Sequence, residues 1–139
     1  MQESRTIKIL IIVSIVSSLA YAHASDVYSV ALARLLVDRS EFVGKRIVVT
    51  GYLARTTHLG IFLTRDHAEV YDWASSIAVS DDTSPKGRPI SDSTCVSSYV
   101  KIVATLFEDE QRYPMLIRVE KVSQPSLKRD CWTGEIKVN

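Results

Sequence analysis

The chain has 139 residues, of which 46% are hydrophobic and 24% are charged, a balance typical of a globular domain that excludes a disordered, collagen-like or coiled-coil chain. Because 17 Lys and Arg residues nearly balance 16 Asp and Glu residues, the net charge of +1 provides no basis for strong attraction to nucleic acid or to an anionic membrane. Nucleic acid is therefore not expected among the partners.

The first 24 residues have the pattern of a signal peptide. A basic segment precedes an apolar run, and Ala22 and Ala24 supply the small residues that a signal peptidase reads. We predict cleavage after Ala24, which leaves residues 25–139 as one domain without net charge, in the periplasm or outside the cell. The alternative is an uncleaved N-terminal membrane anchor, but the apolar run that begins at Ile9 is shorter than the roughly 20 residues needed to cross a bilayer.

A helix is the first element predicted after the cleavage site. Leu32, Leu35 and Leu36 recur at helical spacing within residues 29–38, and Ser29 or Asp26 is placed to cap the helix. The face that carries the leucines must therefore be buried against another element.

Five strands follow the helix. The first covers residues 46–55, and Gly51 within it predicts a bulge or a sharp coil of the kind that curls a small barrel. One or two helical turns are expected within residues 65–72. The other strands are predicted from β-branched residues or alternating hydrophobicity, over residues 60–64, 76–80, 99–107 and 115–122.

Two cysteines lie in the polar regions of the mature chain, one near the end of the long segment 81–98 and one in the tail 123–139. An even number of cysteines in an exported protein predicts a disulfide, here between Cys95 and Cys131. Their wide separation does not fit the C-x-x-C spacing of a redox pair. The segment 81–98 is either functional or simply held by the disulfide.

These elements together predict a mainly β fold, a small five-stranded OB-like barrel with an N-terminal helix and a short helical turn. The pattern resembles small exported bacterial OB-fold proteins of unknown function, in which paired leucines lead to an aromatic residue, Gly-Lys and a strand ending in Gly-Tyr-Leu. The resemblance covers residues 29–122 and implies the OB barrel, but it implies no substrate, because that fold hosts unrelated functions. The matching segments are VALARLL at 30–36, FVGKRIVVTGYL at 42–53, GIFLTRDHA at 60–68 and SIAV at 76–79.

Four aromatic residues form the candidate binding site, because they lie where OB folds often present side chains that stack on a ligand: Tyr52, Phe62, Tyr71 and Trp73. Phe62 also fits a core position, and Trp73 also fits a cover over one end of the barrel. A neutral surface with aromatic anchors suits a protein partner. We therefore predict a non-catalytic binding or accessory module whose partner is another envelope or secreted protein.

Two other functions remain open. His67, with Asp66 beside it, fits a small metal-dependent hydrolase, although the P-C-x-x-C motif of the zinc deaminases is absent. No other catalytic motif is found, so no catalytic residue, metal or cofactor is predicted. The second alternative is a structural component that an uncleaved N-terminus holds at the membrane.

Overall fold

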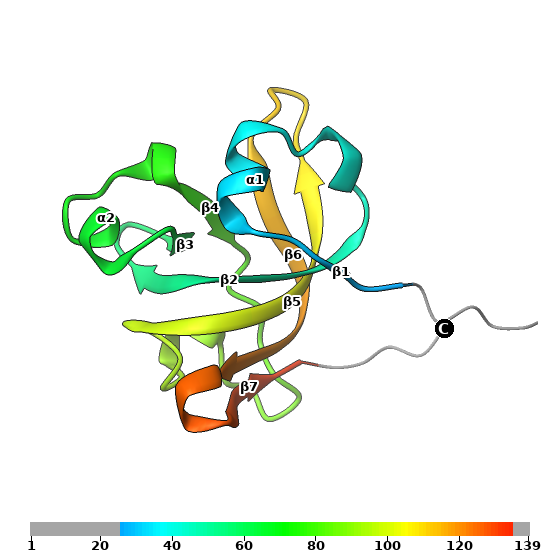
Figure 1. Ribbon diagram of the computed structural model, residues 1–139. Helices are drawn as coiled ribbons and strands as arrows, with labels where there is room; N and C mark the ends of the chain where they lie inside the picture. The colour runs from blue at the N-terminus through cyan, green and yellow to red at the C-terminus, as the bar shows by residue number, and fades with distance from the viewer. Residues whose placement is uncertain (1–25, 135–139) are drawn as a thin grey trace, which may run out of the picture.

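The computed structural model describes residues 26–134, and Figure 1 shows the path of the chain through them. The predicted signal peptide at residues 1–24 lies outside the described residues. Within the described range, no helix is both long and apolar enough to span a membrane. The elements of this range are β1 (Tyr28–Ser29), α1 (Leu32–Val37), η1 (Ser40–Phe42), β2 (Arg46–Arg55), β3 (Leu59–Phe62), α2 (Arg65–Glu69), η2 (Trp73–Ser75), β4 (Ser76–Val79), η3 (Ile90–Asp92), β5 (Ser98–Glu108), β6 (Pro114–Gln124), η4 (Pro125–Leu127) and β7 (Arg129–Thr133), where η marks a 3₁₀ helix.

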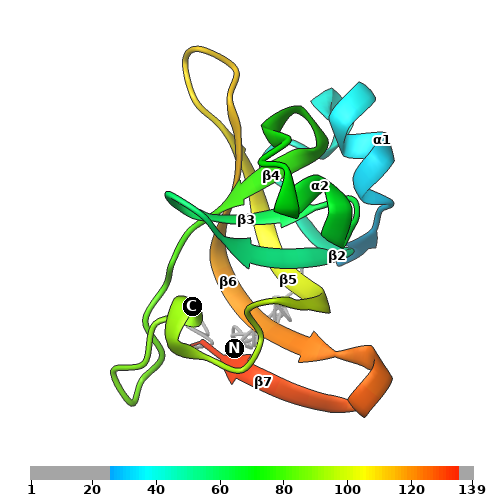
Figure 2. The same cartoon turned by 90° about the vertical axis from the view of Figure 1, so that its left-hand side faces the viewer.

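Five strands close into a barrel. Hydrogen-bonded neighbours follow the order β2, β3, β4, β6 and β5, and β5 pairs again with β2. The β4–β6 pair is parallel, whereas the other four pairs of the barrel are antiparallel. Figure 2 shows the same barrel from the side that carries β3 and α2. The predicted mainly β fold with a small five-stranded OB-like barrel is confirmed.

Alternating side chains fill the barrel. Every second residue of β5 from Val100 to Leu106 is fully buried, as predicted from the sequence. Helix α1 packs against β2, β4 and η2, and its Leu32 and Leu35 belong to the same core. Burial of one such aliphatic side chain stabilises the fold by about 1.5–3 kcal/mol, so the core rather than helix propensity keeps this short helix in place.

Helix α1 begins later than the sequence predicts. Its N-cap is Ala31, which makes no side-chain cap hydrogen bond. Ser29 lies instead in β1, which runs parallel to β2, and the next N–H, that of Val30, donates to the carbonyl of Val48 at 3.0 Å. The prediction that Ser29 or Asp26 caps the helix is therefore wrong, because backbone pairing with β2 draws this segment into the sheet.

Gly51 marks no bulge. The register between β2 and β5 runs without interruption from Arg46 to Leu53. A Cβ at residue 51 would instead lie 2.7 Å from the carbonyl oxygen of Phe62 and 2.7 Å from Cγ1 of Ile61. Glycine is needed here because β2 passes close to β3, which supports the interpretation as a tightly coiled strand and corrects the interpretation as a bulge.

The C-terminal tail carries a strand that the sequence does not predict. Strand β7 pairs antiparallel with β6, and a register shift falls between Val122 and Ser123. The disulfide between Cys95 and Cys131 is confirmed, with 5.5 Å between the two Cα atoms. It joins β7 to the segment that precedes β5, so the tail is attached to the barrel both by backbone pairing and by a covalent bond.

The segment 81–98 is more ordered than a polar loop. Ile90 and Cys95 are fully buried, and Ile90 begins the short helix η3. Thr83 and Pro89 form an isolated antiparallel bridge. The disulfide is thus not the only feature that holds this long polar segment, because the side chains of Ile90 and Cys95 also anchor it to the core.

Candidate functional site

A row of aromatic side chains crosses the outer face of the barrel. Tyr52 of β2 lies directly opposite Tyr99 of β5 on one side and opposite Phe62 of β3 on the other. The rings of Tyr52 and Tyr99 meet edge to face, with their centroids 5.2 Å apart and their planes at 72°. Residues in register on one face of a sheet are direct neighbours, so three strands hold these rings in fixed positions.

Phe62 forms the base of this row. It is fully buried, and with Ala54 and Ala68 it makes a small cluster separate from the barrel core. Trp73 packs on it with 5.2 Å between the ring centroids. A Cβ on Gly60 would lie 3.0 Å from the indole ring of Trp73, so the small residue in β3 makes room for that ring. Phe62 supports the surface from below and offers no exposed area of its own.

His58 extends the row at the turn between β2 and β3. Its imidazole stacks on the indole of Trp73, with centroids 3.9 Å apart and planes 17° apart. The exposed ring of His58 therefore covers one face of the partly exposed ring of Trp73, and the stacked pair forms the edge of the row. We call Tyr52, Phe62, Trp73, Tyr99 and His58 together the aromatic patch.

Tyr71 lies outside the ring contacts of the aromatic patch. It follows α2 with a φ of 53°, and its side chain is 64% exposed. Its backbone N–H donates to the carbonyl of Ala68 at 3.2 Å, which fixes the left-handed turn that leads to Trp73. Of the four aromatic residues predicted for the site, the structure thus brings together Tyr52, Phe62 and Trp73.

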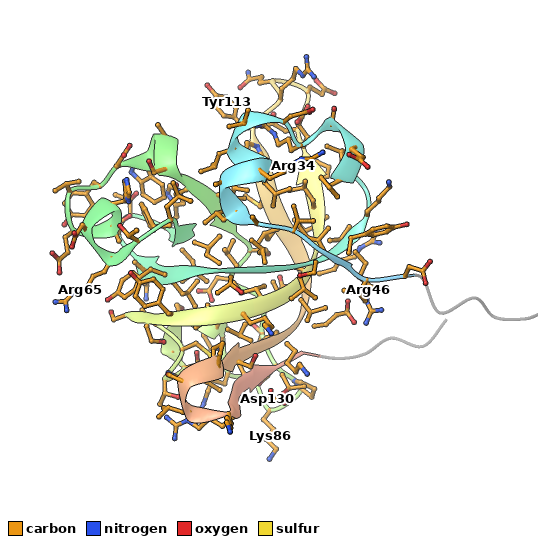
Figure 3. All side chains as sticks on the ribbon, in the orientation of Figure 1. Arg34, Arg46, Arg65, Lys86, Tyr113 and Asp130 are labelled. Carbon is orange, nitrogen blue, oxygen red and sulfur yellow. A yellow bond between two sulfur atoms is a disulfide. The ribbon has the colours of Figure 1, made fainter. Side chains whose placement is uncertain are left out.

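Polar contacts connect α2 with the aromatic patch. The backbone N–H of Arg65 donates to the hydroxyl of Tyr99 at 3.1 Å. The Arg65 side chain, which points away from the barrel in Figure 3, donates from Nε to Glu69 at 2.7 Å. This hydrogen bond raises the pKa of the Arg65 guanidinium above its usual range, so Arg65 keeps its positive charge at the border of the patch.

His67 and Asp66 lie on α2, beside the patch. Nδ1 of His67 is 2.6 Å from the hydroxyl of Thr64, the N-cap residue of the helix, and Nε2 is 4.0 Å from Asp72. The Asp66 side chain is exposed to solvent. Within residues 26–134, no group of three or more His, Cys, Asp or Glu side chains is arranged to hold a metal ion. The contacts of His67 are those of a residue that closes the first turn of a short helix.

The chain was compared with known families, with curated proteins and with solved structures.

None of the three comparisons finds a match. The resemblance to small exported OB-fold proteins thus stays a prediction. A function can be inferred only from the geometry of the aromatic patch.

Sequence reasoning missed Tyr99 and His58. Alternation along β5 puts Tyr99 on the face opposite Val100, and this pattern was sufficient to predict an outward-facing ring. Its contact with Tyr52 depends on the register between two strands far apart in the sequence. The stacking of His58 on Trp73 depends on the path of the chain after α2, for which the sequence carries no periodic signal.

Proposed function

We propose that this protein is an exported, non-catalytic binding module whose aromatic patch captures another protein of the cell envelope or of the extracellular space. The observation that carries the proposal is the aromatic row in register across β5, β2 and β3. Large rings held in place by a sheet lose little conformational freedom on binding, and such residues dominate the energetics of protein interfaces.

Exposure and charge support a protein partner. Tyr99 is 50% exposed and Tyr71 is 64% exposed, so apolar ring area is available to a partner on this side of the barrel. Aromatic residues at the centre of a surface with polar neighbours are typical of protein interfaces. The near-neutral sequence does not favour a polyanionic partner.

The disulfide supports the exported location. Disulfides persist in oxidising compartments, and Cys95 and Cys131 are bonded to each other in this fold. Together with the apolar N-terminal run, this supports an oxidising compartment such as the periplasm or the extracellular space, and the short length of that run favours cleavage over an N-terminal membrane anchor.

Site-specific photocross-linking in cells tests the proposal. A photoreactive phenylalanine analogue replaces Tyr99 in the aromatic patch or, as the matched control, Tyr113, which is 67% exposed in the turn between β5 and β6. Figure 3 shows Tyr113 at the end of the molecule that carries this turn, away from the labelled Arg65 of α2. We expect one discrete product in the envelope or secreted fraction from position 99 and none from position 113.

Alanine variants complete the test. Tyr52→Ala and Trp73→Ala should each reduce the yield of the position-99 product roughly tenfold or more, the scale of an interface hot spot. Thermal unfolding of each variant separates a binding defect from a folding defect, because Trp73 also packs on Phe62. Equal products from positions 99 and 113, or a yield unchanged in well-folded variants, would show that the aromatic patch is not the interface.

A further inference from the structure

A second candidate site lies away from the aromatic patch, between β7 and the turn at residues 84–88. A pocket of about 510 Å³ opens there, within the range of small-molecule sites. In Figure 3, Lys86 and Asp130 mark this end of the molecule, whereas Arg65 marks the end that carries α2. The described residues that line the pocket are Ser84, Pro85, Lys86, Arg88, Cys131, Trp132, Thr133 and Gly134.

The turn that forms one wall is preorganised. The N–H of Ser84 donates to the carbonyl of Arg88 at 2.9 Å, and the N–H of Gly87 donates back to the carbonyl of Ser84 at 2.8 Å. Gly87 has a φ of 79°, as expected where a turn closes a tight hairpin through a left-handed residue. Pro85 further restricts the turn, so little ordering remains to be done when a ligand binds.

The opposite wall is fixed to the turn. The indole N–H of Trp132 in β7 donates to the carbonyl of Arg88 at 2.9 Å. This hydrogen bond fixes the distance between β7 and the backbone of the turn. Cys131 is bonded to the fully buried Cys95, which ties the same strand to the core. The pocket therefore lies between two elements that a hydrogen bond joins to each other, and one of them, β7, is also tied to the core by the disulfide.

The charge of the lining has one sign. Of the described residues that line the pocket, Lys86 and Arg88 are cationic and none is acidic. Both side chains are exposed, and within residues 26–134 neither of them forms an ion pair. Two unpaired cations beside a tryptophan and a proline are suited to an anionic group on an apolar body.

We propose that this pocket binds a small organic anion. The carboxylate or equivalent group of the ligand lies between Lys86 and Arg88, and its flat apolar part lies against Pro85, close to the buried Trp132 whose indole N–H holds the turn. Two cations beside a partly open pocket fit one compact anionic group rather than a long polyanion, which agrees with the near-neutral charge of the chain.

Indole resonances provide a direct test on the intact chain. The sequence contains two tryptophans, so a proton–nitrogen correlation spectrum has two indole signals, and Trp73→Phe assigns them. The probe is naphthoate, a planar ring with one carboxylate, and the matched neutral compound is naphthamide. We expect naphthoate to shift the Trp132 signal in a saturable manner. Naphthamide should bind at least about tenfold more weakly than naphthoate.

Charge variants locate the anion. Lys86→Gln/Arg88→Gln should weaken naphthoate binding by about tenfold or more, whereas Arg55→Gln/Lys101→Gln, which removes two exposed cations outside the pocket, should change it by less than about twofold. Any of four results would overturn the proposal: an unshifted Trp132 signal, equal binding of both compounds, a shift confined to Trp73, or an unaffected pocket variant. A shift confined to Trp73 would place the small anion on the aromatic patch instead, whereas the other three results do not bear on the protein-capture proposal, which rests on different residues.

Discussion

Gly51 illustrates how one residue can determine the closure of the barrel. A Cβ at this position would lie 2.7 Å from a backbone oxygen, that of Phe62, which cannot move without shifting β3. We expect Gly51→Ala to lower the free energy of unfolding by about 1–3 kcal/mol, the usual cost of overpacking, measured by urea unfolding.

The neighbouring residue provides the control for this prediction. Thr50 is exposed on the same strand, so Thr50→Ala should change the free energy of unfolding by about 0.5 kcal/mol or less. A Gly51→Ala variant as stable as the Thr50→Ala variant would mean that β2 and β3 can separate there without cost.

Glu108 is a carboxylate whose protonation is expected to destabilise the protein in acid. Its carboxylate accepts a hydrogen bond from Nε of Arg112 at 3.2 Å and another from Nε of Arg39 at 2.8 Å. The hydrogen bond from Arg112, followed by that from Arg39, holds the pKa of Glu108 below its ordinary value of 4.5. A depressed pKa in the folded state stabilises the protein above the unfolded-state pKa, and this contribution is lost as the pH falls through the folded-state value.

Glu108→Gln should therefore destabilise the protein at neutral pH and make its stability less sensitive to acid. The difference in urea midpoint between the wild type and this variant should be largest near about pH 7 and shrink below about pH 4.5. Glu41→Gln serves as the control, because Glu41 is 61% exposed in its pair with Arg34 and should have little effect. A difference that is constant with pH would show that the charge of Glu108 is not responsible.

At the scale of single residues, the sequence singled out aromatic residues of which three lie together in the structure, but it did not predict their contacts. Tyr52 and Trp73 were identified from their positions in the OB-like pattern. In the structure, both side chains pack against the small cluster that contains Phe62. A core position was among the interpretations of Phe62, but its packing with Ala68 in a second small core was not predictable, because α2 folds over the outside of the barrel. Such a cover is a tertiary feature that has no periodic signature.

Among the elements, the disulfide and β7 form one stabilising unit. Closing a loop with a sequence separation of 36 removes conformational entropy from the unfolded chain. We expect Cys95→Ala/Cys131→Ala to lower the free energy of unfolding by about 3–4 kcal/mol in urea unfolding.

Reduction of the wild type serves as the matched comparison for this variant. Reduced wild type and the double alanine variant should have similar urea midpoints, both below that of the oxidised protein. A variant with the stability of the oxidised protein would mean that pairing of β7 with β6 is sufficient to hold the tail.

The elements that the sequence predicted are those with a regular pattern. The strand at residues 46–55 coincides with β2, because its β-branched residues form a long run, and the alternation in β5 identified its buried face. Strand β7 escaped prediction because Arg129 and Asp130 are exposed and only Trp132 is buried, so the strand depends on its pairing with β6 and on the disulfide. The start of α1 was misplaced because pairing with β2 overrides a plausible cap.

For the whole molecule, export is the prediction that decides where a partner should be sought. The protein expressed with its own N-terminus should have the intact mass of a chain that begins at Ser25, and its thiols should react with an alkylating agent only after reduction. A full-length mass would favour the membrane-anchored alternative. Thiols that react without reduction would contradict the assignment to an oxidising compartment.

The disulfide also divides the chain into a covalent ring and two linear arms. Residues 95–131 form the ring, which contains β5 and β6 with the turn between them, whereas β2, β3 and β4 lie on the N-terminal arm. Trypsin cleavage after Arg112, exposed in that turn, would yield two polypeptides that remain one molecule until reduction. Cleavage after Lys86 would release the N-terminal arm at once upon unfolding. The β5–β6 turn is thus a place where this protein can be cut, labelled or extended while its pieces stay joined by the disulfide.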